Sequence, residues 1–166
     1  MNKLLFAVLA LASVGAANAQ IKVGIVNVQK ALLDTEEIKK AQTEMEAKYK
    51  ARTDKIVQLQ KELQEIQNQL QSGKLNQVGE QELNAEGQKK QRDLQRLQQD
   101  LQEDVDRERN DVLQRAGTRM QDVVKKLADE KGLDLILDTT NTLFFKPAME
   151  LTADATTAYN KAYPVK

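Results

Sequence analysis

The chain has 166 residues, in which 25 Lys and Arg balance 25 Asp and Glu, and it contains no Cys, His or Trp. These absences exclude disulfides, thiol nucleophiles, imidazole metal sites and Ser-His-Asp triads, so we expect neither an enzyme nor a metal or cofactor site. The zero net charge argues against nucleic-acid binding, which needs a basic surface. The high charged fraction, 30%, favours long solvated helices.

Residues 1–19 have the pattern of a secretory signal peptide. Lys3 precedes an apolar run from Leu4 to Val14, and the small residues of Ala17-Asn18-Ala19 provide a cleavage site before Gln20. A membrane anchor is the alternative, but it requires roughly 20 apolar residues to cross the hydrocarbon. We therefore expect an exported mature chain, residues 20–166.

A short strand over residues 21–28 opens the mature chain, because Val and Ile are concentrated there. Asn27 is expected to cap a first helical turn. Asp34 then precedes Glu37 by three residues, the spacing of a helix cap and its reciprocal acid.

Residues 35–131 are predicted to form a coiled-coil hairpin, with its tip near residues 73–79. Apolar residues follow a heptad pattern from Ile38 to Leu70, where Arg52 interrupts it once, and the pattern resumes between Leu83 and Leu127. In an antiparallel pair, facing residues have a constant index sum, and Ile66 with Gly87 is one of several pairs that sum to 153.

After the hairpin, residues 133–138 and 142–146 are predicted strands, and a final helix is expected to begin at Leu151-Thr152. The hairpin returns the chain to its start, so residues 20–34 and 132–166 should form one discontinuous body with a three-stranded sheet. Such a sheet is too small to enclose a core and leaves open edges. We therefore expect an α+β fold whose sheets close into a shared barrel in a cyclic homo-oligomer.

The residues at this point resemble the Skp/OmpH family of periplasmic chaperones over essentially the whole mature chain. The resemblance rests on KVGIVNVQKAL, the long hairpin, GLDLILD followed by LFF, and the ELT-initiated last helix. It implies a homotrimer in which three sheets form a trimeric β-barrel and three hairpins surround a cavity like tentacles. It further implies an ATP-independent holdase that keeps unfolded outer-membrane proteins soluble in the periplasm of Gram-negative bacteria.

Candidate contacts with an unfolded client are apolar residues that a two-helix seam cannot fully cover. These are Met45, Tyr49, Leu75, Val78, Val112 and Met120. The alternative is that they simply pack the hairpin, which their heptad positions favour for all but the two tip residues, Leu75 and Val78. The residues expected to fill the barrel are Val23, Ile25, Leu135, Leu137, Phe144 and Phe145, and alternation leaves open which Phe points inward.

The net charge of the hairpin tip indicates whether the tip could bind anionic membrane surfaces. Residues 72–92 hold four basic residues against three acidic ones. This near-neutral tip argues against the contact with lipopolysaccharide or anionic membranes that the resemblance implies. A structural coiled-coil spacer of the cell envelope is the competing hypothesis, although a passive spacer needs neither a closing barrel nor an apolar tip.

Overall fold

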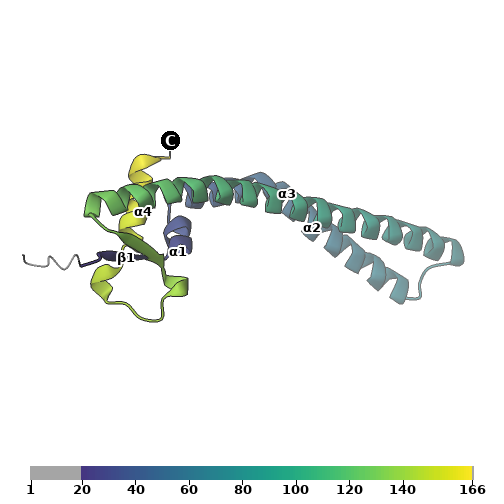
Figure 1. Ribbon diagram of the computed structural model, residues 1–166. Helices are drawn as coiled ribbons and strands as arrows, with labels where there is room; N and C mark the ends of the chain where they lie inside the picture. The colour runs from purple at the N-terminus through teal and green to yellow at the C-terminus, as the bar shows by residue number, and fades with distance from the viewer. Residues whose placement is uncertain (1–19, 166) are drawn as a thin grey trace, which may run out of the picture.

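The computed structural model describes residues 20–165, so the expected signal peptide lies outside the described residues. Figure 1 shows a small body from which two long helices project together as an arm. Within residues 20–165, no helix is both long and apolar enough to cross a membrane. The elements in chain order are β1 (Val23–Val26), α1 (Val28–Leu33), α2 (Glu36–Gln71), α3 (Gln77–Lys131), β2 (Leu135–Asp138), the 3-10 helices η1 (Thr139–Asn141) and η2 (Pro147–Met149), and α4 (Thr152–Ala162).

Side-chain caps and one glycine define the ends of the arm helices. Thr35 is the N-cap of α2, and its hydroxyl accepts a hydrogen bond from the Ile38 amide at 3.3 Å. Asn76 caps α3 in the same way, and Gly132 ends α3 in the left-handed conformation that favours glycine. With 36 residues in α2 and 55 in α3, α3 extends well past α2 and lies over the body.

The predicted pairing of the two arm helices is confirmed near the tip. A methyl group added at Gly87 would lie 3.3 Å from Ile66 Cγ2, so these two positions face each other. Lys90 pairs with Glu62 at 2.6 Å, close to the same register. Closer to the body, Arg52 pairs with Asp104 at 2.6 Å, one turn of α3 beyond Leu101, the residue expected opposite Arg52.

The sheet has two strands, and the predicted third strand is wrong for this subunit. β1 and β2 are parallel, with Val23 opposite Leu135 and Ile25 opposite Leu137. Residues 142–146 form no strand; the last backbone pairing with β1 is an isolated bridge from Glu150 to Ile25. The segment carries strand-forming residues, but within one subunit it meets no backbone that could complete a ladder.

The body core lies where α1, α3 and α4 meet β1. The Asn27 cap is confirmed, since its side chain accepts from the Lys30 amide at 2.8 Å. Thr152 accepts a hydrogen bond from the Asn27 amide at 2.9 Å, which fixes the start of α4 against the end of β1. The buried cluster consists of Val26, Ala31, Ile38, Ala116, Met120, Val123, Leu127, Ala155 and Tyr159.

Candidate functional site

An apolar groove of about 730 Å³ runs along the part of the arm nearest the body. Three of the predicted contact residues, Met45, Tyr49 and Val112, line it together. The other lining residues are Leu33, Ile38, Ala41, Gln42, Glu46, Lys50, Thr53, Asp54, Val105, Arg109 and Leu113. Sequence periodicity indicated the individual residues, and their convergence in one groove comes from the tertiary structure.

The groove stays open because the hairpin does not cover its own seam here. On α2, Ala41 is too short to reach across and Met45 is only partly buried. Leu33, at the end of α1, lines the groove and keeps 45% of its surface exposed. The result is an accessible apolar surface next to the junction of body and arm, a type of surface that marks binding sites in soluble proteins.

Tyr49 belongs to the wall of the groove and is bound to α3 through its hydroxyl. Its hydroxyl donates a hydrogen bond of 2.6 Å to Glu108, which also accepts one of 2.7 Å from Lys48. Hydrogen bonds from Lys48 and then Tyr49 hold the pKa of Glu108 below its ordinary value, and the bond to Glu108 raises the pKa of Tyr49. This contact links α2 to α3, and only 8% of the Tyr49 surface is exposed.

Most charged residues that line the groove have an ion-pair or hydrogen-bond partner within the chain. Lys50 pairs with Asp54 at 2.8 Å, and Glu46 accepts a hydrogen bond from Gln42 at 3.2 Å. Arg109 has no ion pair or hydrogen bond within residues 20–165. The same described range contains no cluster of three or more acidic side chains able to hold a metal ion.

A polar cluster at the root of the arm was not identified from the sequence. Glu37, expected to support a helix cap, instead binds Arg119 at 2.9 Å and accepts a 2.6 Å hydrogen bond from the Tyr159 hydroxyl. Arg115 approaches the same carboxylate at 3.3 Å. Partial burial acts to raise the pKa of Glu37, but the hydrogen bonds from Tyr159 and Arg119 outweigh it and lower that pKa. The partners lie 78 to 122 residues away along the chain, so no local spacing could indicate them.

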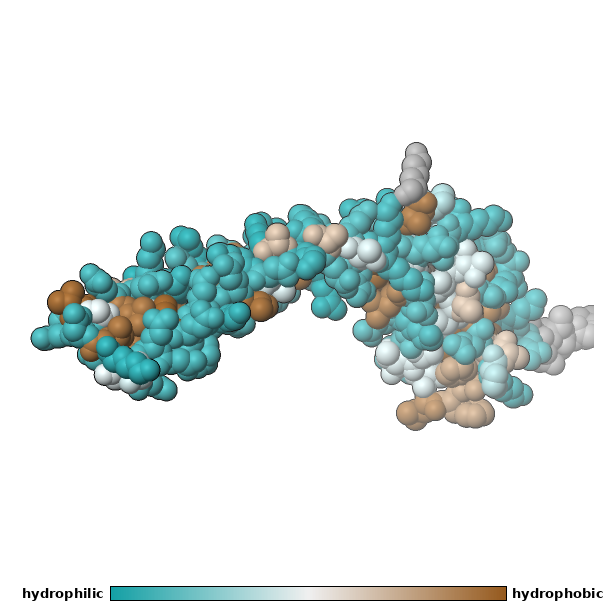
Figure 2. All heavy atoms as spheres, turned by 180° about the vertical axis from the view of Figure 1, so that it is seen from behind, coloured by the Kyte–Doolittle hydropathy of each residue, from teal (hydrophilic) through white to brown (hydrophobic). Residues whose placement is uncertain are grey.

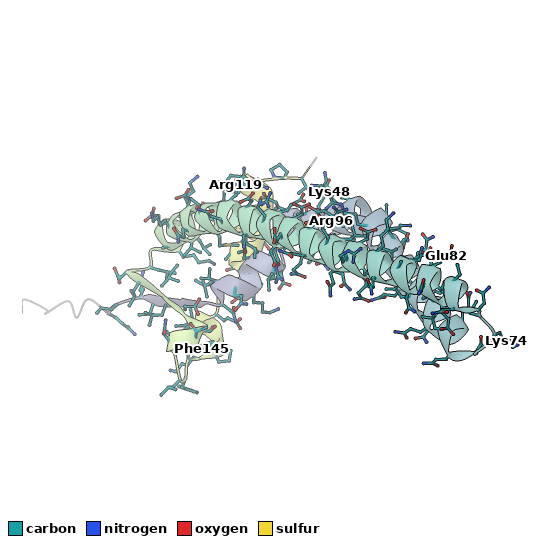
Figure 3. All side chains as sticks on the ribbon, turned by 90° about the vertical axis from the view of Figure 1, so that its right-hand side faces the viewer. Lys48, Lys74, Glu82, Arg96, Arg119 and Phe145 are labelled. Atoms are coloured by element: carbon teal, nitrogen blue, oxygen red, sulfur yellow. The ribbon has the colours of Figure 1, made fainter. Side chains whose placement is uncertain are left out.

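Two of the predicted contact residues lie at the far end of the arm. Figure 2 shows an apolar patch there, away from the body. Val78 is 62% exposed, whereas Leu75 is half-buried. Figure 3 places Lys74 and Glu82 at the same end of the arm.

Met120 is not available to a client, contrary to the expectation. It has no exposed surface and lies in the body core, among the buried residues of α1, α3 and α4. The heptad pattern continues unbroken from the arm into the part of α3 that covers the body. Position in the heptad therefore could not separate a groove residue from a core residue.

The residues expected to fill a barrel fall into two groups. Val23, Ile25, Leu135 and Leu137 share one sheet face, as the strand register and alternation require. Leu135 and Leu137 remain 45% and 38% exposed, but Ile25 is only 1% exposed and is already buried within its own subunit.

The two phenylalanines lie on the segment that follows β2. Phe144 is 83% exposed, whereas Phe145 is half-buried. Figure 3 places Phe145 at the end of the body remote from the arm. Apolar surface is therefore concentrated on one side of the body, away from the α3–α4 core.

Comparisons with known proteins agree with this architecture. Residues 22–159 match the family model described as "Outer membrane protein (OmpH-like)". A Skp-like protein of Pseudomonas aeruginosa is 24% identical over 138 residues, which cover 82% of each chain. The crystal structure of an OmpH-like protein from Caulobacter crescentus shares the fold, with a TM-score of 0.69, 17% identity and 89% of both chains covered. Since the family model spans most of the sequence, the chain belongs to the OmpH-like family, which confirms the resemblance seen in its sequence.

Proposed function

We propose that this protein is an ATP-independent holdase chaperone of the periplasm, which binds unfolded outer-membrane proteins and prevents their aggregation. The observation that carries the proposal is the open apolar groove formed by α1, α2 and α3. Its Met45 side chain is flexible and can adapt to different apolar partners. Several such grooves acting on one chain would give useful affinity while each contact remains easily released, so no ATP is required.

A homotrimer is the assembly we propose for this function. The apolar sheet face, with Leu135 and Leu137 partly exposed and Phe144 almost fully exposed, supports it. A two-stranded sheet with a free edge is also a surface that pairs readily with another chain. In the assembled protein, the open sheet faces of the subunits would close into a shared barrel, and the arms would surround a cavity.

The direct test is an aggregation assay without nucleotide. An outer-membrane β-barrel protein is diluted from urea with and without this protein, and turbidity is followed over time. Suppression near stoichiometric ratios is the expected result. No suppression would contradict the holdase proposal and favour a structural spacer. Light scattering of the purified protein tests the assembly separately, because a stable monomer would rule out the shared barrel.

A further inference from the structure

We infer that the groove selects client segments in which a carboxylate lies beside apolar side chains, and that Arg109 binds this carboxylate. The inference rests on the proposed holdase function and refines it, because it states which part of an unfolded chain the groove prefers. It comes from the charges along the groove, where one cation has no partner in the described part of the chain.

Arg109 is an exposed residue on the side of the groove that α3 contributes. Val105, Arg109 and Leu113 are each four residues apart, so they form one stripe along the helix. All three line the groove, opposite the wall formed by α2. A guanidinium in this position lies next to any apolar side chain that enters the groove.

The neighbouring cations are already committed to partners in this chain. Lys50, which also lines the groove, binds Asp54 at 2.8 Å. Lys48 and Arg52, on the adjoining turn of α2, bind Glu108 and Asp104 at 2.7 and 2.6 Å. Arg109 is the one groove-lining cation for which the described residues offer no hydrogen bond or ion pair.

The hydrogen-bonding geometry of the Arg109 guanidinium indicates which group on a client would bind it. A guanidinium presents parallel N–H donors that match the two oxygens of a carboxylate, and such pairs strengthen where apolar contacts exclude water. Glu46 has the opposite effect, because its carboxylate lines the same groove and, among the residues that the structure describes, is bound only by Gln42. The groove therefore favours an acidic group on the side of α3 and disfavours one on the side of α2.

The test uses short fluorescent peptides that share alternating Leu and Phe and differ only in one central residue, which is Glu, Gln or Lys. Fluorescence anisotropy measures their binding to the purified protein. We expect the Glu peptide to bind about fivefold more tightly than the Gln peptide, with the difference shrinking as salt is added. Arg109→Gln should abolish this preference, and Glu46→Gln should increase it.

Arg96→Gln is the matched control, because Arg96 lies on α3 outside the groove with 77% of its side chain exposed. It should retain the preference. Equal binding of the Glu and Gln peptides, a preserved preference in Arg109→Gln, or no binding of any peptide would each overturn the inference. Peptide binding that falls as protein concentration rises would assign the groove to contact between copies and would also overturn it. If the protein suppresses aggregation but shows no peptide preference, only this inference fails; if it does not suppress aggregation, the proposed function itself fails.

Discussion

The Tyr159 hydroxyl donates a 2.6 Å hydrogen bond to Glu37, and this contact helps to join the last helix of the body to the first turn of the arm, where the Glu36 amide also donates to Asn160 at 3.0 Å. Arg119 binds the same carboxylate from α3 and stacks over the Tyr163 ring, 4.8 Å from its centre. Three helices therefore meet at one carboxylate. Glu37 therefore links the root of the arm to both α3 and α4.

Removing the Tyr159 hydroxyl should weaken this junction. Tyr159 is completely buried, so Tyr159→Phe keeps its packing and deletes only the hydrogen bond. We expect the free energy of unfolding, measured in urea, to fall by about 1–2 kcal/mol. Tyr163→Phe is the control and should change stability little. Equal unfolding midpoints for the Tyr159→Phe variant and the unmodified protein would show that the bond does not stabilise the fold.

Acid should weaken the same junction. Because the pKa of Glu37 is lower in the folded protein than its ordinary value of 4.5, its ionised form stabilises the fold. That contribution is present above about pH 4.5 and is lost as the pH falls through the folded pKa. Glu37→Gln should therefore flatten the acid limb of a plot of stability against pH. Glu36→Gln, an exposed neighbour, should leave that limb unchanged, and an unchanged limb in Glu37→Gln would contradict the assignment.

A charge placed in the groove should impair client binding without unfolding the arm. Met45 lines the groove and is only half-buried, so Met45→Glu puts a carboxylate on the apolar wall at modest cost to stability. We expect aggregation suppression to require several-fold more protein, while the helical circular dichroism is unchanged. Val57→Glu, at a 59% exposed position of α2 outside the groove, is the control. Equal activity of both variants would remove the groove from the mechanism.

A charge on the open sheet face should dissociate the assembly. Leu135 is 45% exposed in one subunit, so Leu135→Asp is tolerated by the isolated body but would be buried unpaired in a shared barrel. Sedimentation velocity should show subunits with intact helical content, while Val57→Asp remains assembled. An intact oligomer in Leu135→Asp would place Leu135 outside the interface.

Two glycines of α3 should respond in opposite ways to larger side chains. A methyl at Gly117 would meet no atom within 4 Å, so Gly117→Ala gains helix propensity and should raise stability by about 0.5–1 kcal/mol. At Gly87 the added Cβ would already lie 3.3 Å from Ile66, and Gly87→Leu should lower stability by about 1–3 kcal/mol. Thermal unfolding of both variants checks this. A stabilised Gly87→Leu would show that the two helices separate easily near the tip.

Much of the arm follows from the sequence because its information is local. The heptad spacing and the break near Gly73 depend on residues a few turns apart. The pairing of Ile66 with Gly87 follows from a simple antiparallel register of the two helices. The cap at Asn27 and the terminating Gly132 are local for the same reason. The candidate contact residues Met45, Tyr49 and Val112 could be selected from periodicity alone, although not their common groove.

The burial of individual apolar residues and the formation of a third strand could not be predicted, because they depend on which residues lie nearby in space. The heptad pattern treats Met45 and Met120 alike, but α1 and α4 cover only Met120. Strand propensity over residues 142–146 is real, yet a strand needs a partner backbone that one subunit does not provide. By itself, the sequence determined a long antiparallel helical arm and its register, because these arise from repeated short-range contacts. Only the tertiary structure decided which apolar residues stay open, that Glu37 joins three helices and that Arg109 finds no partner among residues 20–165, because burial and charge pairing depend on residues distant in the chain.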